Sequence, residues 1–445
     1  MTTAIWTLHK HNKFNTLSNI VKLFDRLIEH KDPERENLSW SRALGVVKKT
    51  IFEDNVDSSH NNIAFIRVPC LSYQPQHALG HRNWNWERDI LPVVNWCLDN
   101  HIKVVLDDCW ENGAVFYKTR RGKLTEWWPF LLENNIKILT NVPPLYDLYH
   151  FDTKDDDTFK FQIEDWKKVY IDAKFFLFHT RQVHQQENYI FKMNTYPTLH
   201  EDKKYLFSCM FGDITKKNNA MLYGLLLKNN LIDDDVFIST IMEKSEPELL
   251  DKKQYTLHSG SRTQWAMSLN RSHEIVDWVN ENKDIIYQHM PFERNAWQIN
   301  KMKVDGEAER RIPQELYDSH FAINVETMHY PWFYTEKTFK HIIAKVPFLS
   351  YGGSYHSSGL KKYLGFERFE EIFDYSFEEI PPKNTHHFLL MDGINSNIKQ
   401  LKQEPVSIFN QASVREKLDY NESLFYKLST TDRVKEHLEN IIGAV

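Results

Sequence analysis

The residues best suited to chemistry lie in the stretch YTEKTFKHIIAKVPFLSYGG, residues 334–353. Thr335 can cap a helix that begins here, and Glu336 suits the positive end of the helix dipole, in which case Lys337 is merely solvated. The same residues can also hold an anion, because the first turn of a helix has backbone N–H groups without intrahelical partners and Lys337 adds a positive charge. A diphosphate is the kind of ligand that such a helix start would bind.

A carboxylate precedes this helix start. In FAINVETMHYPWFYTEK, residues 321–337, side chains alternate between two faces as in a strand, and Glu326 falls at the carboxyl end of that strand. A nucleotide-sugar donor requires a cation and helix N–H groups for its diphosphate, and a carboxylate to accept from its ribose hydroxyls. The segment from Glu326 to Lys337 contains each of these groups.

This segment resembles the donor-binding segment of the α1,3-fucosyltransferases, in which an apolar strand and a Glu are followed by an aromatic-rich loop, Tyr-x-Thr-Glu-Lys, a helix and Val-Pro. Residues 317–375 are more similar still to glycosyltransferase-like proteins common in tailed phages, which carry Thr-Glu-Lys-Thr-Phe-Lys, Pro-Phe and Leu-Gly-Phe in the same order. Elsewhere in the chain the resemblance is weaker. It implies two facing Rossmann-like domains of the GT-B type, with the nucleotide sugar held mainly by the C-terminal one and no metal required.

The resemblance also implies roles for individual residues. Lys337 would contact the diphosphate, Glu336 the ribose, and Glu326 the donor sugar or the loop beneath it. Thr335 and Lys340 lie in the same segment and are further donor-binding candidates.

A second basic group is expected near the start of the C-terminal domain, where the fucosyltransferases have a residue that meets the diphosphate. This sequence has Lys216 and Lys217 in FGDITKKNNAML instead of the expected arginine. The two lysines are donor-binding candidates, and a solvated lysine pair is the alternative.

The N-terminal half must supply the acceptor site and, if the sugar is inverted, a general base. Asp107, Asp108 and Glu111 cluster in VVLDDCWENG, just after a predicted strand. The phage proteins tend to have an Asp followed by Glu-Gly there, whereas this sequence has Glu-Asn-Gly. A carboxylate in a cleft can act as the base, because burial raises its pKa toward that task. A capped helix start is the alternative interpretation of this cluster.

The acceptor could be a hydroxymethylated base in phage DNA, a lipopolysaccharide or another glycan. For a DNA acceptor, the phosphates could be bound by the basic run KTRRGK, with Lys118, Arg120, Arg121 and Lys123. Trp110, near the acidic cluster, could stack on the target base once it has left the duplex. The formal charge of −6 and the 14% aromatic content favour a glycan instead. A module that binds a nucleotide sugar or DNA without turnover is a third hypothesis, and a solvated turn would explain the basic run without any ligand.

Other polar residues are weaker candidates. His179 is the next possible base, although a lone histidine at a strand end is more often structural. The Gly80 between His77 and His81 weakens any helical metal site there. The acidic triplets 155–157 and 233–235 are interpreted as solvated loops. The sequence has no Walker loop, GxGxxG fingerprint, nucleophile elbow or zinc spacing, which removes support for hydride transfer, ATP hydrolysis and serine hydrolase chemistry.

Strand-like and helix-like segments alternate along the chain and must position these residues. The predicted strands are 62–69, 103–109, 136–142 and 174–180, then 205–212, 235–241, 321–326 and 347–351. The predicted helices are 87–100 with Pro92 in its first turn, 218–230, 335–345 and 432–442, and residues 1–60 are also predicted to be helical. This alternation predicts an α/β protein with two mostly parallel sheets.

Length and composition set the domain plan. A chain of 445 residues exceeds the size at which one core stops growing. We expect an acceptor-side domain at 1–200, a nucleotide-sugar-binding domain at 201–405 and C-terminal helices at 406–445 that dock across both. The 4 cysteines lack CxxC spacing, and no signal-peptide or membrane-spanning run is visible, so we expect a protein of the cytoplasm, the host's if the protein is viral. The family resemblance implies that its activity is that of a hexosyl-, fucosyl- or pentosyltransferase.

The DNA-acceptor hypothesis makes a prediction about salt. Duplex binding by the wild type should weaken as salt rises, and replacing Lys118, Arg120, Arg121 and Lys123 by Ala should reduce the slope of log affinity against log salt by about 0.9 for each phosphate that is no longer neutralised. Affinities measured across a salt series, on modified and unmodified duplexes, test this. If the wild type shows no salt-dependent binding, the DNA-acceptor hypothesis is wrong, and a glycan becomes the working hypothesis.

Overall fold

The computed structural model describes residues 2–8, 45–67, 90–107, 129–140, 170–172, 203–211, 217–239, 269–288, 312, 314–326, 334–379, 386–428 and 431–445. The chain forms two compact units, one of residues 1–184 with 427–445 and the other of residues 185–426. The predicted boundary at 200 and 201 lies outside the described residues, as does the predicted strand 174–180.

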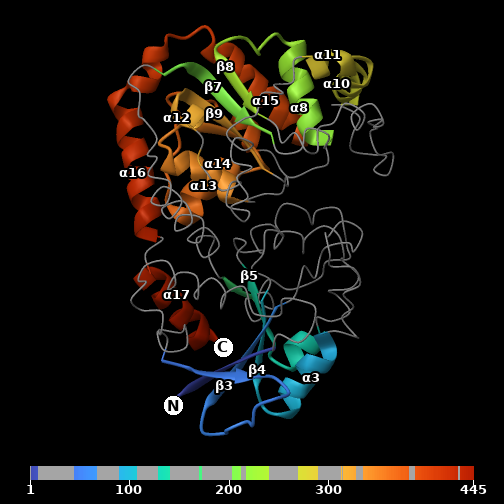
Figure 1. Ribbon diagram of the computed structural model, residues 1–445, viewed down its shortest axis with the longest axis vertical. Helices are drawn as coiled ribbons and strands as arrows, with labels where there is room; N and C mark the ends of the chain where they lie inside the picture. Colours follow the sequence, from blue (N-terminus) through green and yellow to red (C-terminus); the bar gives the residue numbers. More distant parts are fainter. Residues whose placement is uncertain are drawn as a thin grey trace. The chain divides into compact units, whose positions relative to one another are not determined.

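The first unit contains a parallel sheet. Its strands are β1 (Thr3–Thr7), β2 (Val47–Thr50), β3 (Asn61–Arg67), β4 (Lys103–Asp107), β5 (Lys137–Thr140) and β6 (Tyr170–Asp172). They are arranged in the order β2-β1-β3-β4-β5-β6, and every pair is parallel. Helix α3 (Leu91–Asp99) lies against this sheet near β4, and α17 (Thr431–Ala444) belongs to the same unit (Figure 1).

Helix α3 shows why the local sequence folds as it does. Pro92 lies in its first turn, as predicted, where a missing N–H removes no intrahelical bond. Val93, Val94 and Cys97 are buried at helical spacing, while His101 after the helix end has a positive φ of 55° that stops the helix.

The prediction that residues 1–60 are helical is wrong for the described part of that range. TAIWT at 3–7 forms β1, an inner strand of the sheet, and VKKT at 47–50 forms β2 at its edge. Five residues of buried strand are too short to stand out against polar surroundings. An edge strand also tolerates lysines on its exposed side, so β2 lacks the apolar run of an inner strand.

The second unit contains a smaller parallel sheet. Its strands are β7 (Tyr205–Met210), β8 (Val236–Ser239), β9 (Ser319–Val325) and β10 (Phe348–Tyr351), in the order β10-β9-β7-β8. Its helices are α8 (Lys217–Lys228), α10 (Leu269–Glu281), α11 (Lys283–Gln288), α12 (Gln314–Tyr317), α13 (Glu336–Ile343), α14 (His356–Gly359), η7 (Leu360–Leu364), η8 (Ser376–Glu378), α15 (His386–Leu401), η9 (Val406–Asn410) and α16 (Ala412–Leu428).

The two faces of this sheet differ in chemistry. One face is apolar: Phe207, Phe321 and Ile323 belong to the main hydrophobic core, which α8, α10 and α15 complete. The opposite face has Asn324 and Ser350 side by side in register, both fully buried. Helix α13 covers this polar face, because Thr338 on α13 contacts Asn324.

Helix α16 packs along one side of this unit (Figure 1). Phe425 on α16 lies 5.5 Å, between ring centroids, from Phe339 on α13. Asn421 accepts from the backbone N–H of Glu367 at 2.7 Å and donates to its carbonyl at 2.9 Å. Docking of residues 406–445 across both domains stays a prediction.

The α/β prediction is confirmed in its coarse form, with two parallel sheets and helices. The triplet 233–235 is also confirmed as a solvated loop, since Asp233 and Asp235 are exposed and pair with Lys402. No helix in the described ranges is long and apolar enough to cross a membrane.

Gly393 provides a test of the packing between α15 and η8. A Cβ at this position would lie 2.2 Å from the Cβ of Phe377, which ring rotation cannot move. We therefore expect Gly393→Ala to lower the free energy of unfolding by roughly 1–3 kcal/mol in urea denaturation, despite the better helix propensity of Ala. Ser396→Ala, exposed on the same helix, should change it by less than about 0.5 kcal/mol. Equal stability of the two variants would contradict this packing.

Candidate functional site

The chain order of the second sheet defines where a ligand can bind. From β7 the chain continues to β8 on one side, and it then crosses to β9 on the other side of β7. In open α/β sheets, ligands bind beyond the carboxyl ends of the strands at such a reversal of direction. The carboxyl ends of β7 and β9 are adjacent, since Cys209 pairs with Ile323. This edge of the sheet is the candidate site.

Helix α13 begins at this edge. Its N-cap is Thr335, with extended φ and ψ of −123° and −175°, and the Thr335 hydroxyl accepts from the backbone N–H of Lys337 at 3.3 Å. The predicted capping role of Thr335 is therefore confirmed. The helix dipole and the remaining N–H groups of the first turn favour negative charge just beyond this point.

Glu326 follows β9 and is only 1% exposed. Its Oε2 accepts from the Thr335 hydroxyl at 2.6 Å, and its Oε1 accepts from the Thr335 backbone N–H at 3.1 Å and from the Thr338 hydroxyl at 2.6 Å. The Asn324 amide also points toward Oε1, at 3.5 Å. A buried carboxylate needs several donors to offset its desolvation, and Glu326 receives them from β9 and from the start of α13.

Thr338 lies at the centre of this cluster. Its hydroxyl donates to Glu326, accepts from Asn324 Nδ2 at 2.9 Å and lies 3.1 Å from His356 Nε2. A hydroxyl has one proton, so His356 Nε2 must be the donor in the last contact, which assigns its tautomer. All three hydrogen-bonding positions of Thr338 are then occupied. We call Asn324, Glu326, Thr335, Thr338, Ser350 and His356 the Glu326 cluster.

Gly352 permits this close arrangement. A Cβ at Gly352 would lie 2.8 Å from His356 Cδ2, 3.0 Å from Ser350 Oγ and 3.3 Å from Glu326 Cγ. Any larger residue would push the carboxylate or the imidazole out of place. The glycine after β10 thus serves packing against the cluster.

The histidines of this region are neutral. Burial lowers the pKa of His341 to about 4, although its Nδ1 donates to the Lys337 carbonyl at 2.6 Å. Burial, together with the nearby His341, lowers the pKa of His356 to about 3. Tyr334, directly before the cap, donates its hydroxyl to the His356 carbonyl at 2.8 Å, so α14 holds the approach to α13 as well.

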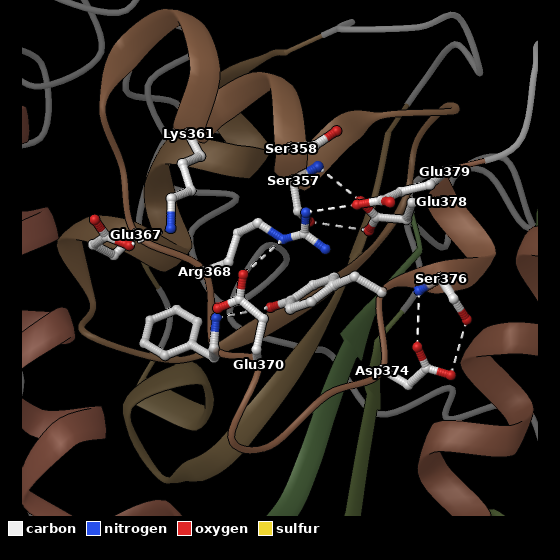
Figure 2. A network of polar contacts seen from close by, with 12 residues as sticks. Ser357, Ser358, Lys361, Glu367, Arg368, Glu370, Asp374, Ser376, Glu378 and Glu379 are labelled. Atoms are coloured by element: carbon white, nitrogen blue, oxygen red, sulfur yellow. Dashed lines mark hydrogen bonds and ion pairs between the residues drawn. The ribbon is translucent and has the colours of Figure 1, made fainter.

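A second polar network holds α14 from the other side. Figure 2 shows Glu378 facing Ser357, whose backbone N–H and hydroxyl donate to the carboxylate at 2.7 and 3.0 Å. The Glu378 carbonyl accepts from the N–H of Tyr355 at 2.6 Å. Tyr355 has a positive φ of 59°, a conformation that these contacts must hold in place. Burial raises the pKa of Glu378 to about 7, against the opposing hydrogen bonds from Ser357 and the charge of Arg368.

Arg368 lies among carboxylates in this network (Figure 2). Its Nη1 is 2.8 Å from Glu379 Oε1, and its Nε is 3.4 Å from Glu370 Oε1, an ion-pair distance without a hydrogen bond. The guanidinium stacks 4.5 Å from the Tyr375 ring centroid. A cavity of about 20 Å³ beside Arg368 and Ser357 has room for about one water molecule and none for a nucleotide.

The structure places only part of the predicted site. Of the predicted residues, Glu326 and Thr335 contact each other as described, Lys337 is half-buried one residue into the helix, and Lys340 is 7% exposed. Lys217 is the first residue of α8 and Glu336 the first of α13, and their side chains lie outside the described ones.

In the first unit, Asp107 is fully buried at the carboxyl end of β4. The remaining predicted site residues lie outside the described ranges: Asp108, Trp110, Glu111, Lys118, Arg120, Arg121, Lys123, Lys216, His77, His81 and His179. Among the described residues, no group of three or more His, Cys, Asp or Glu side chains could hold a metal ion.

Several residues that complete the site carry no motif of their own. The sequence patterns do not single out Asn324, Thr338, His356 or Glu378, although Asn324 and Thr338 lie within the donor-binding segment. A polar residue inside an apolar strand is a usable signal for Asn324. No local pattern links Glu378 to Ser357, because that contact depends on the fold.

Comparison with protein-family models, with curated proteins and with solved structures found no match to this chain. The resemblance to the fucosyltransferases and the phage proteins therefore depends on the motifs in residues 317–375 alone.

Three buried groups make stability depend on pH. Below pH 6.5 the unfolded chain takes up protons at His341 and His356 that the folded protein does not bind, so these residues lower stability as pH falls. Glu378 acts in the opposite direction, because its raised pKa lets the folded protein bind a proton between about pH 7 and pH 4.5. Taken together, these three groups decrease stability on acidification, because the unfolded chain gains two protons where the folded protein gains one.

We expect Glu378→Gln to steepen this decrease between pH 6.5 and 4.5 by about 1.4 kcal/mol per pH unit, because it removes the one opposing proton. The free energy of unfolding, measured in urea at several pH values, tests this. Glu416→Gln, exposed on α16, is the matched control and should leave the slope unchanged. A slope for Glu378→Gln equal to that of the wild type would contradict proton binding by Glu378 in the folded protein.

Proposed function

We propose that this protein is a nucleotide-sugar-dependent glycosyltransferase whose two Rossmann-like units face each other in a GT-B arrangement. The donor binds at the carboxyl ends of β7 and β9, with its diphosphate at the start of α13. Two parallel sheets and the motif resemblance support the fold, and no metal ion takes part in the proposed reaction.

The observation that carries the proposal is the meeting of two distant segments at one edge of the second sheet. Lys216 and Lys217 follow β7, and the segment from Glu326 to Lys340 follows β9; the pairing of β7 with β9 makes these strand ends neighbours. Each segment is a diphosphate-binding candidate on the sequence alone. Helix N–H groups and lysines at the reversal of strand order are the parts that a nucleoside diphosphate requires.

The reaction follows from these parts. An acceptor hydroxyl attacks the anomeric carbon, its proton passes to a carboxylate among Asp107, Asp108 and Glu111, and the bond from the anomeric carbon to the diphosphate oxygen breaks. Lys337 and the N-terminus of α13 stabilise the negative charge on the departing nucleoside diphosphate. Asp107 lies at the carboxyl end of a parallel strand, where α/β enzymes place catalytic groups.

The acceptor is a hydroxymethylated base in DNA or a hydroxyl of a glycan, and the salt dependence of duplex binding separates the two. Slow hydrolysis of a nucleotide sugar without acceptor would distinguish the enzyme from a module that only binds. A thermal-shift panel of nucleoside diphosphates and nucleotide sugars identifies the donor, because a ligand that binds only the folded state raises its apparent stability.

Lys337→Ala tests the donor site. We expect affinity for the nucleoside diphosphate found by the panel to fall at least tenfold, since a hydrogen bond to a charged group contributes roughly 1.5–3 kcal/mol. Stability should change by less than about 1 kcal/mol, because the side chain is not part of the core. Lys399→Ala, exposed on α15, is the matched control. Unchanged calorimetric affinity in folded Lys337→Ala protein would remove the donor-site assignment.

A further inference from the structure

We propose that Glu326 is a positioning residue, which fixes the start of α13 against β9 and does not touch the donor. The inference deepens the proposed function, on which its consequence for donor binding rests. The motif resemblance leaves two roles for Glu326, contact with the donor sugar or with the loop beneath it, and the geometry points to the second kind of role.

The first argument is that the carboxylate is already occupied. Glu326 is 1% exposed, and its two oxygens accept from the Thr335 N–H and from the hydroxyls of Thr335 and Thr338 at 2.6–3.1 Å. Oε2 accepts a single hydrogen bond from the described residues, but a sugar hydroxyl could reach its remaining lone pair only if the buried cluster opened, because Glu326 is almost fully enclosed.

The second argument is that these contacts fix the geometry of the helix start. Glu326 accepts two hydrogen bonds from Thr335, one from its backbone N–H and one from its hydroxyl, and a third from Thr338 in the first turn of the helix. The Thr335 hydroxyl donates to Glu326, which leaves its lone pairs free to accept from the Lys337 N–H. The carboxylate thus orients the hydroxyl that caps α13, as well as holding the helix against β9.

The third argument is that the support continues behind Thr338. His356 and Asn324 both donate to the Thr338 hydroxyl, and Asn324 also donates to Ser350 at 3.2 Å. These contacts tie α13 to β9, β10 and α14. A ligand at the helix start would therefore meet N–H groups whose direction is set before it binds, which lowers the ordering cost of binding.

The first experiment needs no ligand. Hydrogen exchange of the backbone amides in α13 should be at least about tenfold faster at Thr335 and Lys337 in Glu326→Gln and in Thr338→Val, because these amides lose their ordered acceptors. Thr338→Ser, which keeps the hydroxyl, should restore slow exchange. Ser208→Ala removes a buried hydroxyl of the same sheet that has no hydrogen-bond partner among the described residues, and it should leave exchange in α13 unchanged. Unchanged exchange in both Glu326→Gln and Thr338→Val would overturn the proposal.

The second experiment separates positioning from contact with the sugar. UDP and GDP, and then UDP-glucose and GDP-fucose, are titrated calorimetrically into each variant. Positioning predicts that Glu326→Gln and Thr338→Val weaken the nucleoside diphosphate and its nucleotide sugar by the same factor, roughly tenfold, or about 1.4 kcal/mol. Thr338→Ser should bind as the wild type does.

Weaker binding confined to the nucleotide sugars in Glu326→Gln, with Thr338→Val unaffected, would mean that Glu326 contacts the sugar, and the proposal would be wrong. If the wild type binds neither these four ligands nor any nucleoside diphosphate or nucleotide sugar of the thermal-shift panel, the proposed function fails, and the exchange experiment alone decides whether Glu326 positions α13. Since Thr338→Val and Thr338→Ser differ from the wild type by single atoms or groups, the test survives even if Glu326→Gln does not fold.

Discussion

The buried carboxylate of Glu326 is the constraint on which the second unit depends. A charged group that is 1% exposed is tolerated only when donors surround it, and here they come from a strand, a cap residue and the first turn of a helix. Thr335 and Thr338 must both be hydroxyl residues to supply them. The close approach at Gly352 follows from the same requirement, because the carboxylate, Ser350 and His356 leave no space for a Cβ.

This cluster explains why the two faces of the second sheet differ. The face that packs on α8, α10 and α15 is apolar and contributes the hydrophobic free energy of the unit. The face under α13 has Asn324 and Ser350, which fix the helix by directional bonds that slide less easily than apolar contacts do. Directional hydrogen bonds are therefore better suited than apolar contacts to a helix start that must present its N–H groups in one direction.

The Arg368 and Glu378 network extends the same support outward. Glu378 accepts hydrogen bonds from the backbone of Tyr355 and Ser357, the two neighbours of His356. His356 in turn donates to Thr338, and Thr338 donates to Glu326. Neutral histidines and a carboxylate with a raised pKa are the consequence of burying this many polar groups together. The same buried polar groups therefore fix the position of the helix start and make the stability of the protein depend on pH.

The sequence by itself determined the alternation of strands and helices in the described part of the chain, the cap at Thr335 and the segment after β9, because periodicity, capping and strand ends are local. It did not reveal β1 and β2, which are short, and β2 lies at a polar edge. Only the tertiary structure decided that β7 lies beside β9, which makes the carboxyl end of β7 a neighbour of the strand end that precedes Glu326. Nor could the sequence show that Thr335 and Thr338 both donate hydrogen bonds to Glu326, or that His356 supports Thr338 from behind. Strand order and burial result from packing between segments far apart in the chain, and residue spacing along the sequence does not encode that packing in a form that can be read directly.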